Sequence, residues 1–232
     1  MQPDVKRALV LGGTGAVGGA VLRELARRGV PAVFGYLRSE ARAMALAAEH
    51  GHTPLRIDLA DPAATAAALD AQDTPDVVIH AAGVSGALSL AEIDLATWRR
   101  AMAVNVESAY QVCRWIAARG RPCDIVLVGG LDRAQSLPLP VHFAATQGAL
   151  SAMTMALGHE LGPRGVRINL VALGVLDAGI SAQLASHRRK DYEKFSALRR
   201  AGTADEAARV IAWLALENTL IQGKVVSVNG GI

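Results

Sequence analysis

The chain has 232 residues, of which 51% are hydrophobic, 19% charged and only 4% aromatic, and its formal net charge is +3. This composition is typical of a soluble globular domain with a core of Ala, Val, Leu and Ile, and the length favours one large α/β unit over two. Because the basic residues are scattered, a nucleic-acid surface is disfavoured, and the one short run, Arg188–Lys190, is interpreted as a solvated loop.

Nothing in the sequence indicates export, a membrane span or a metal site. The amino terminus leads into a short apolar strand without a signal-peptide core, and no uncharged apolar run is long enough to cross a bilayer. Cys113 and Cys123 lie too far apart for a Cys-x-x-Cys motif and have no histidine cluster around them. They are expected to be reduced thiols of a cytoplasmic protein that does not bind membranes.

Short β-rich runs alternate with longer, Ala-rich helical stretches along the chain. The predicted strands are Arg7–Leu11, Ala32–Tyr36, Leu55–Asp58, Val77–Ala81, Ile125–Val128, Arg167–Leu173 and Val225–Val228. The predicted helices are Ala16–Arg28, Ser39–His50, Pro62–Ala71, Leu95–Arg119, Val141–Leu161 and Ala204–Leu216. Asp61 before Pro62 is an N-cap signal, and Thr203 with Glu206 has capping-box spacing.

This alternation predicts the fold class. Several predicted strands are apolar throughout, which indicates burial on both faces, as in a parallel sheet. We therefore expect an α/β fold with a Rossmann-type, doubly wound, seven-stranded parallel sheet flanked by helices, which binds ligands beyond the carboxyl ends of its strands. No internal repeat or linker interrupts the pattern, so residues 1–232 are expected to form a single domain.

A glycine-rich turn, Gly12–Gly19, lies between the first predicted strand and the first helix. Glycines allow the chain to turn sharply and bring backbone N–H groups close to a pyrophosphate, and the helix amino terminus adds a partial positive charge. A plain strand–helix loop is the alternative, but the position after the first strand of a βαβ unit favours dinucleotide binding. The predicted contacts in this turn are Gly12, Thr14, Gly15, Val17 and Gly18.

The end of the second predicted strand indicates which dinucleotide binds. NAD-binding units usually place a carboxylate there, which accepts hydrogen bonds from the ribose hydroxyls, but residues 25 to 39 contain no Asp or Glu. Arg38 and Ser39 present a guanidinium and a hydroxyl instead, and the planar fork of arginine suits a phosphate. A surface arginine without a role is the alternative. The pattern favours NADP(H) as the cofactor.

Further motifs follow in a recognisable order: Asp58-Leu59, His80–Gly83, Asn105 within Val104–Val106, and the closing segment Gln222–Gly231. With them, the chain resembles the short-chain dehydrogenase/reductases, and within these the 3-oxoacyl-carrier-protein reductase type, over essentially its full length. The glycine spacing matches the extended and atypical branches of that family best. The resemblance implies cofactor contacts at Asp58, Leu59, Ala82 and Gly83 and identifies Asn105 with the family's catalytic Asn.

The catalytic segment departs from the family pattern. Where the family has a Ser at the end of the fifth strand, followed by a Tyr and a Lys on the next helix, this chain has Gly130, Phe143 and Gln147. Gln147 and Gly174 are still expected to contact the cofactor. However, Ala178 stands where the family has a Thr that holds the nicotinamide amide, so that contact is weakened.

These substitutions exclude the family's usual proton transfer. Hydride addition to a ketone creates an alkoxide, which the family's Tyr protonates with a pKa lowered by the neighbouring Lys. Phe143 has no ionisable group and Gln147 has no charge. The first hypothesis is an atypical NADPH-dependent carbonyl reductase that takes its proton from water, from an acidic substrate group, or from Asp132 or His142. The alternative interpretation of Asp132 is a surface pair with Arg133. A helix directs the side chain of His142 about 100° away from that of Phe143, which argues against a position of His142 in the pocket.

The second hypothesis is a catalytically silent NADP(H)-binding subunit or scaffold, which pairs with an active reductase or reports cofactor levels to a partner. A third is another reaction on the same fold, such as dehydration, cyclisation or isomerisation. An open cleft favours the enzyme, whereas a pocket plugged by Phe143, Leu173 or residues 178–199 favours the silent subunit. For the enzyme, the resemblance suggests an acyl- or polyketide-type carbonyl substrate, small or carrier-bound.

The predicted helices Leu95–Arg119 and Val141–Leu161 are apolar on more than one face. Their apolar residues include Trp98, Met102, Val106, Leu150, Met153 and Leu157. Core packing explains part of this pattern, and the remainder predicts a partner surface. In the family that the chain resembles, these helices pair across a two-fold axis, and the closing strand Val225–Val228 helps to form a second interface. A homodimer, a homotetramer or a hetero-oligomer with a related reductase is expected.

Overall fold

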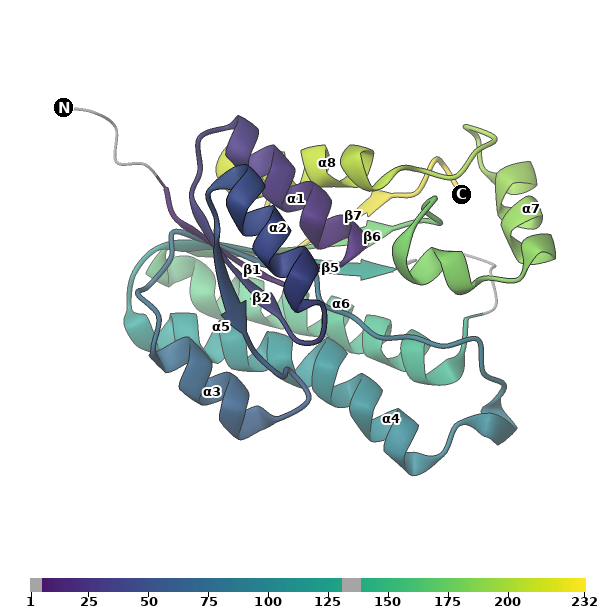
Figure 1. The fold of residues 1–232 in the computed structure, drawn as a ribbon, viewed down its shortest axis with the longest axis horizontal. Coiled ribbons are helices and arrows are strands. Elements are labelled where there is room, and N and C mark those ends of the chain that lie inside the picture. The colour runs from purple at the N-terminus through teal and green to yellow at the C-terminus, as the bar shows by residue number, and fades with distance from the viewer. Residues whose placement is uncertain (1–5, 131–138) are drawn as a thin grey trace.

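The computed structural model describes residues 6–130 and 139–232. At its centre lies a parallel sheet of seven strands in the order β3-β2-β1-β4-β5-β6-β7 (Figure 1). The strands are β1 (Ala8–Leu11), β2 (Ala32–Tyr36), β3 (Thr53–Arg56), β4 (Val77–His80), β5 (Cys123–Gly130), β6 (Val166–Leu173) and β7 (Val225–Val228). This arrangement confirms the predicted Rossmann-type α/β fold.

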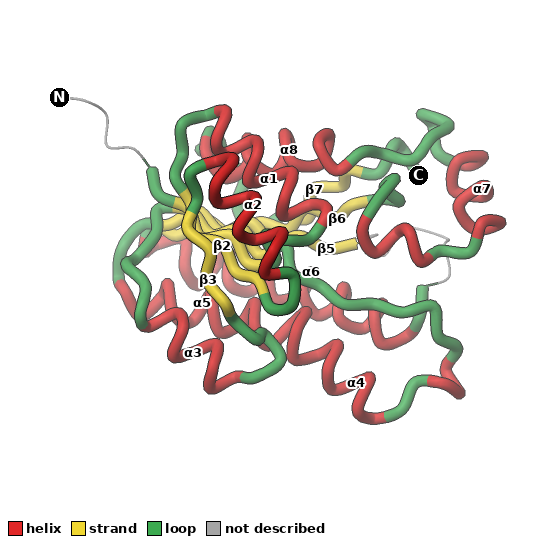
Figure 2. The backbone as a smooth tube through the Cα atoms, viewed as in Figure 1, coloured by secondary structure: helices red, strands yellow, loops and turns green. Residues whose placement is uncertain are grey.

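Helices cover both faces of the sheet, as Figure 2 shows. One layer consists of α1 (Ala16–Arg27), α2 (Glu40–His50) and α8 (Ala204–Leu216). The other consists of α3 (Pro62–Asp70), α4 (Leu95–Met102), α5 (Ser108–Arg119) and α6 (Val141–Leu161). Each layer packs its own apolar core against the sheet, the first around Leu22 and Phe34, the second around Ile116 and Leu127. The central strands are therefore buried on both faces, which accounts for their apolar sequence.

The strand order reverses at β1. From β1 the sheet grows one way through β2 and β3 and the other way through β4 to β7. The loops after β1 and β4 therefore diverge and leave a crevice at the carboxyl ends of the strands, where doubly wound sheets bind ligands. The turn Gly12–Gly19 and the segment His80–Gly83 both lie at this crevice.

Three predicted boundaries were wrong. The stretch Leu95–Arg119 is not one regular helix, because a π-helical turn, η2 (Ala103–Glu107), separates α4 from α5. β5 runs beyond Val128 because it remains paired with β6 up to the pair Gly130↔Leu173. β3 begins two residues earlier than predicted; it is a partly exposed edge strand, so its apolar pattern is weak.

The interpretation of Arg188–Lys190 as a loop was also wrong. The run lies in helix α7 (Ser186–Phe195), which follows the short helix η4 (Gly179–Gln183). Tyr192 is the one buried residue of α7, and its hydroxyl donates a hydrogen bond to the Asn229 carbonyl. A helix attached by a single buried side chain has no apolar periodicity, so the sequence pattern does not reveal it.

Both predicted helix caps are present. The Asp61 carboxylate accepts hydrogen bonds from the backbone N–H groups of Ala63 and Ala64 at 2.9 and 3.1 Å. Thr203 and Glu206 form a reciprocal capping box at the start of α8, with the Glu206 N–H donating to Thr203 Oγ1 at 3.2 Å and the Thr203 N–H to Glu206 Oε2 at 2.9 Å. The caps satisfy backbone donors that helix starts leave unpaired.

The two cysteines are buried free thiols, as predicted. Burial raises the pKa of Cys113 to about 12 and raises that of Cys123 as well, so neither is a reactive thiolate near neutral pH. Across the described ranges, no helix is long and apolar enough to span a membrane.

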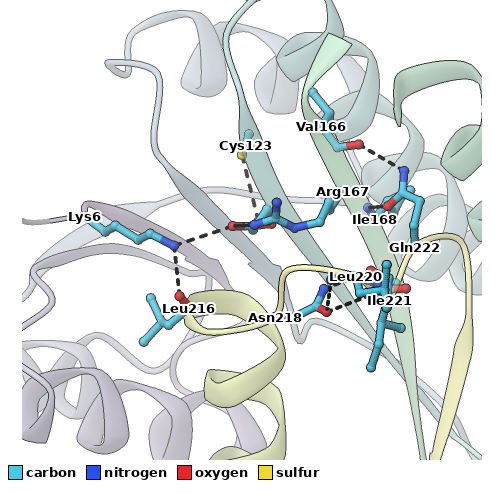
Figure 3. A network of polar contacts seen from close by, with 12 residues as sticks. Lys6, Cys123, Val166, Arg167, Ile168, Leu216, Asn218, Leu220, Ile221 and Gln222 are labelled. Carbon is cyan, nitrogen blue, oxygen red and sulfur yellow. Dashed lines mark hydrogen bonds and ion pairs between the residues drawn. The ribbon is translucent and has the colours of Figure 1, made fainter. Parts of the chain in front are cut away.

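A cluster of charged groups holds the amino-terminal edge of the sheet (Figure 3). Arg167 on β6 donates to the carboxylate of Asp124, its register partner on β5, at 2.8 Å. Lys6, just before β1, lies 3.6 Å from the same carboxylate and donates to the Leu216 carbonyl at the end of α8 at 3.0 Å. Burial raises the pKa of Asp124 even though both cations oppose the shift, so desolvation offsets much of the attraction.

Candidate functional site

The turn after β1 is shaped by glycines that no other residue can replace without a shift of the backbone. Gly12 has φ +82°, and a Cβ there would lie 2.7 Å from Ala82 Cα. A Cβ on Gly18 would lie 2.2 Å from the Gly12 carbonyl oxygen. Gly15 precedes the first helical residue of α1, and no side chain caps this helix. The first N–H groups of α1 are therefore available to an anion, as predicted for a phosphate.

A cavity of about 720 Å³ opens at the carboxyl ends of the strands. Its wall contains the predicted cofactor contacts Gly15, Val17, Ala82, Gly83, Gln147 and Gly174. It also contains Asn105, Gly130 and Phe143, which the family resemblance assigns to catalytic positions. Seven predicted cofactor contacts lie outside this wall, in or beside the turns after β1, β2 and β3: Gly12, Thr14, Gly18, Arg38, Ser39, Asp58 and Leu59. The structure thus joins the predicted nicotinamide end to the predicted catalytic positions.

A neutral hydrogen-bond network links α6 to the π-helical turn. The Asn105 side chain is bound to the backbone of Val84, with Oδ1 accepting at 2.8 Å and Nδ2 donating at 2.9 Å. Asn105 Nδ2 also donates to Thr146 Oγ1 at 3.1 Å, and Thr146 donates to the Phe143 carbonyl at 2.7 Å. Asn105 is therefore fixed in one orientation by groups on two other segments, the backbone of Val84 and α6.

Gln147 extends this network to the end of β5. Its Oε1 accepts the Gly130 N–H at 2.8 Å, and its Nε2 donates to Thr146 Oγ1 at 3.1 Å. The opposite amide orientation would place two donors against each other at Gly130, so the chemistry of the partners fixes which atom is oxygen. One N–H of Gln147 has no partner within the described residues and belongs to a side chain of the cavity wall.

The two glycines at the end of β5 leave room for the side chains of α6. A Cβ on Gly130 would lie 3.0 and 3.1 Å from Cε1 and Cζ of Phe143, and a Cβ on Gly129 would lie 2.6 Å from Gln147 Oε1. Residues 130, 143 and 147 therefore form one packing unit. Any side chain at Gly129 or Gly130 requires α6 side chains to move.

His80 connects the end of β4 to the same π-helical turn. The Ser108 hydroxyl donates to the Val104 carbonyl at 2.7 Å, so the contact of 2.7 Å between His80 Nε2 and Ser108 Oγ is donated by the imidazole. Burial lowers the pKa of His80 to about 4, so the ring is neutral at pH 7 with its hydrogen on Nε2. His80 is thus a fixed donor beside the segment that carries Asn105.

The predicted ribose site lies at the ends of β2 and β3. Arg38 and Ser39 are exposed, and the Ser39 side chain makes no capping bond to α2. In the parts of the chain that the structure describes, Arg38 forms no ion pair. Asp58 accepts the Ala60 N–H at 2.9 Å and so shapes the turn that carries Leu59. A guanidinium and a hydroxyl are therefore both available for an anion.

The candidate substitute acids have different positions. Asp132 lies outside the described residues. His142 is only 2% exposed, and it is absent from the cavity wall although Phe143 lines it, in agreement with the expected 100° turn between them. Sequence reasoning missed His187 and Arg188, which line the cavity from α7. The loop interpretation of Arg188–Lys190 gave this segment no place at the cavity.

α7 is fixed over the cavity by close packing on β6. A Cβ on Gly174 would lie 2.1 Å from the Tyr192 hydroxyl and 2.8 Å from Asn229 Cα. Gly174 lines the cavity and Tyr192 is 1% exposed. The close contact between these two residues therefore fixes the distance of α7 from the cavity wall at Gly174. His187 and Arg188 are held at the opening by this anchor.

Comparison with known proteins agrees with this geometry. The family model described as enoyl-(acyl carrier protein) reductase matches residues 13–232. The cyclic-di-GMP-binding biofilm dispersal mediator protein of Escherichia coli (strain K12) is 28% identical over 229 residues, 97% of this chain and 96% of that protein. A 3-oxoacyl-[acyl-carrier-protein] reductase of Pseudomonas aeruginosa is 28% identical over 245 residues, 100% of this chain and 99% of that protein.

Solved structures share the whole fold. BdcA in complex with NADPH superposes with a TM-score of 0.90 at 25% identity, covering 98% of this chain and 94% of that one. A short chain dehydrogenase from Burkholderia cenocepacia J2315 in complex with NADP gives a TM-score of 0.88 at 29% identity, with 97% of each chain covered. Together with the family match over residues 13–232, these similarities show that the chain belongs to the short-chain dehydrogenase/reductase family.

Proposed function

We propose that residues 1–232 form one NADP(H)-binding domain. The residues present fit this cofactor. A Cβ on Gly12 or Gly18 would fill the space within the turn after β1, and the first turn of α1 has no side-chain cap. Arg38 and Ser39 supply hydrogen-bond donors just after β2. An uncapped helix start suits a pyrophosphate, and a guanidinium suits a 2′-phosphate. The BdcA and Burkholderia structures, which hold NADPH and NADP, support the choice.

The domain acts as an atypical NADPH-dependent carbonyl reductase. The observation that carries this proposal is the open cavity, whose wall includes Gly15 and Gly83 on the cofactor side and Asn105 and Phe143 on the catalytic side. Phe143, Leu173 and parts of the segment 178–199 line the cavity without closing it. When bound, NADPH supplies the hydride, and the chain orients the substrate beside it.

The wall gives the substrate hydrogen bonds but no family-type acid. The free N–H of Gln147 is a neutral donor to a substrate or ribose oxygen, and Phe143 contributes an apolar surface. Among the described wall residues, the ionisable ones are Glu92, His187 and Arg188. Hydrogen bonds from Ser89 lower the pKa of Glu92, and arginine keeps its proton. The proton therefore comes from water, from the substrate, from His187, or from Asp132.

The substrate we propose is an acyl- or polyketide-type carbonyl compound, small or carrier-bound. The cavity has an apolar lining, which includes Leu88, Leu139, Val141, Leu150, Leu176 and Leu184. The Pseudomonas aeruginosa relative is named as a reductase of 3-oxoacyl groups on a carrier protein, which supports a substrate of this type.

A catalytically silent NADP(H)-binding subunit is the second candidate. The side chains of Asn105, Thr146 and Gln147 bind one another and the Gly130 N–H without any ionisable member, as expected where proton transfer is no longer required. The Escherichia coli relative is named for binding cyclic-di-GMP and for biofilm dispersal rather than for a reaction, which favours a regulatory role of this kind.

The test compares NADPH consumption by wild type and by the variant Gly130→Ser, Phe143→Tyr, Gln147→Lys, with generic ketones and 3-oxoacyl thioesters. Wild type is expected to be nearly inert, and the triple variant is expected to gain about 10²- to 10⁴-fold, the usual contribution of general acid catalysis. Phe143→Tyr alone is the matched control and should gain much less, because its phenol keeps a pKa near 10 without the Lys.

Other outcomes distinguish the candidates. Brisk wild-type turnover that Asp132→Asn or His187→Gln abolishes identifies a substitute acid. Activity on a single substrate with its own acidic hydroxyl indicates substrate-assisted reduction. A triple variant that binds NADPH but stays inert contradicts the reductase and favours the silent subunit.

We also propose that the chain forms a dimer or tetramer. Of the apolar residues on the predicted partner helices, Leu150 belongs to the core, but Leu95, Tyr110 and Met155 on α4, α5 and α6 remain 68%, 49% and 43% exposed. Trp213 on α8 is 41% exposed. Exposed apolar side chains on adjacent helices are typical of subunit interfaces. Light scattering at micromolar concentration tests this, and a monomer contradicts a homo-oligomer.

A further inference from the structure

The net positive charge of the chain is concentrated in one segment beside the cavity. Residues 186–200, which form α7 and the five residues after it, contain six lysines and arginines against two acids, so their formal charge of +4 exceeds the +3 of the whole chain. Figure 1 shows α7 beyond the carboxyl ends of β5 and β6, and its first turn supplies His187 and Arg188 to the cavity wall. The basic segment therefore borders the cavity.

Neighbouring acids neutralise only part of this charge. Arg189 pairs with Glu193 at 3.3 Å, and Arg200 pairs with an acid on α8. Glu92 is the one acid among the described residues of the cavity wall. Its Oε2 already accepts hydrogen bonds from the N–H and the hydroxyl of Ser89, at 2.8 and 2.7 Å. The wall thus has a cationic side at α7 and a single acid that is bound within its own turn.

The closing segment of the chain holds α7 in place, in addition to the buried tyrosine of the helix. The Leu198 N–H donates to the Gly230 carbonyl at 3.1 Å. A Cβ on Gly231 would lie 2.8 Å from Ala197 Cβ, so the two backbones approach closely. Side chains on an element that is packed in this way present their charges to a ligand more precisely than side chains on a loop.

An apolar cavity with cationic groups at one side fits an amphipathic anion. An anion in apolar surroundings is costly unless a cation binds it, and the fork of arginine suits carboxylates and phosphates alike. We propose that the substrate carries an anionic group, a carboxylate or a phosphate, at the end remote from its carbonyl, and that His187 and Arg188 bind this group. The proposal rests on the proposed function and narrows its acyl-type substrate to an acidic one.

The test measures dissociation constants by calorimetric titration of the purified, full-length protein, both free and with NADP⁺, so that binding is separated from turnover. The probes are 9-oxodecanoate and its methyl ester, which share the ketone and the apolar chain and differ in charge. Wild type is expected to bind the carboxylate about 10- to 100-fold more tightly than the ester. Raising the ionic strength from about 0.05 to about 0.5 M should reduce this preference, because salt screens charges.

Variants locate the anion. His187→Gln and Arg188→Met are each expected to remove part of the preference for the carboxylate, and the double variant is expected to bind carboxylate and ester alike. Arg164→Met is the matched control. Arg164 is exposed, has no ion pair within the described residues and lies before β6, at the opposite edge of the sheet. Loss of its charge should leave the preference unchanged.

A second pair of probes distinguishes the two sources of an anion. The 3-oxodecanoyl thioesters of phosphopantetheine and of pantetheine differ only in the phosphate. A preference within the first pair alone indicates a free oxo acid, and a preference within the second pair alone indicates the arm of a carrier; each supports the inference.

Two results would overturn the inference and leave the proposed function standing. One is equal binding of the charged and the neutral probe in both pairs, and the other is a preference that survives in the double variant. The proposed function is tested separately, by NADPH consumption with the same probes. Binding that is selective for the charged probe without NADPH consumption would support the anion site and contradict the reductase alone.

Discussion

At the amino-terminal edge of the sheet, charged side chains pair with one another and amide side chains bind the backbone, whereas the cavity at the carboxyl-terminal edge is lined mainly by glycines, apolar groups and neutral amides. Asp124 at the start of β5 holds both Arg167 and Lys6 (Figure 3). Gln222 joins α6 to β6, because its Nε2 donates to the Gly158 carbonyl at 2.7 Å while Oε1 accepts a backbone N–H of β6. The first edge is tied together by side chains.

The second edge is arranged for a ligand. Its ionisable wall residues within the described chain are Glu92, His187 and Arg188, and none of them lies on a strand. Three strands end in a glycine or lead directly into one, with Gly12 after β1, Gly130 at the end of β5 and Gly174 after β6. The side-chain contacts that hold the sheet thus lie at the amino-terminal ends of the strands, opposite the end at which doubly wound sheets bind ligands.

The largest effect is expected at the glycine turn. Gly18→Ala should destabilise the fold by about 3 kcal/mol or more and abolish NADPH binding, since its Cβ would meet the Gly12 carbonyl oxygen at 2.2 Å. Gly148→Ala on α6 is the control, because a Cβ there meets nothing within 4 Å and should stabilise by about 0.5–1 kcal/mol. Urea unfolding and cofactor titration measure both. Similar behaviour of the two variants would contradict the special geometry of the turn.

The next effect depends on pH and concerns His80, at the end of β4. Burial lowers its pKa to about 4 from an ordinary 6.5, so the unfolded chain binds the proton more readily between these values. The contribution of neutral His80 to the free energy of unfolding is fully present above pH 6.5 and is lost as pH falls towards 4. The free energy of unfolding should therefore decline by about 2 kcal/mol from pH 7 to pH 5.

His80→Asn tests this origin, since an amide can still donate to Ser108 but does not titrate. The free energy of unfolding of the variant should fall less than that of wild type from pH 7 to pH 5. His52, whose pKa burial also lowers, contributes in both proteins and cancels in the comparison. Parallel curves for the two proteins would show that His80 is not the titrating group.

A smaller effect is expected at the amino-terminal edge. Asp124→Asn should destabilise by about 1 kcal/mol and leave NADPH affinity unchanged, because Arg167 and Lys6 are 34% and 39% exposed and solvent screens their attraction. Asp73→Asn is the control: Asp73 is 88% exposed in its pair with Arg7 and should have almost no effect. A loss of NADPH affinity in Asp124→Asn would mean that the two edges are coupled.

Local patterns predicted the fold and the cofactor turn. The Asp61 cap and the Thr203–Glu206 box are read from neighbouring residues, and both are present as predicted. All seven predicted strands are present too, although β3 is shifted and β5 is longer than predicted. The exceptions depend on tertiary contacts. α7 is held by Tyr192 against β6 and β7, and the π-helical turn accompanies bonds from His80 and Asn105 to distant segments.

The same limit applies to the site. The positions of Gly130, Phe143 and Gln147 followed from the family pattern, but the bond from the Gly130 N–H to Gln147 depends on how α6 packs on β5. His187 and Arg188 gave no signal of their place in the cavity wall, since it depends on how α7 packs beside Gly174. Sequence motifs locate residues along the chain; only the packing of elements shows which of them meet.

The smallest effect is expected at the end of β5, where the neighbouring Phe143 ring borders the cavity. Gly130→Ala places a Cβ 3.0 Å from Phe143 Cε1, but the ring borders an open cavity and can move a few tenths of an ångström. We expect destabilisation below about 1 kcal/mol, and a coupling of about 0.5 kcal/mol with Phe143→Leu in a double-mutant cycle. A cost of several kcal/mol would show that the ring is held rigidly. In that case Ser at 130 cannot be accommodated beside an aromatic ring at 143, and the catalytic test must begin from Phe143→Tyr with Gln147→Lys alone.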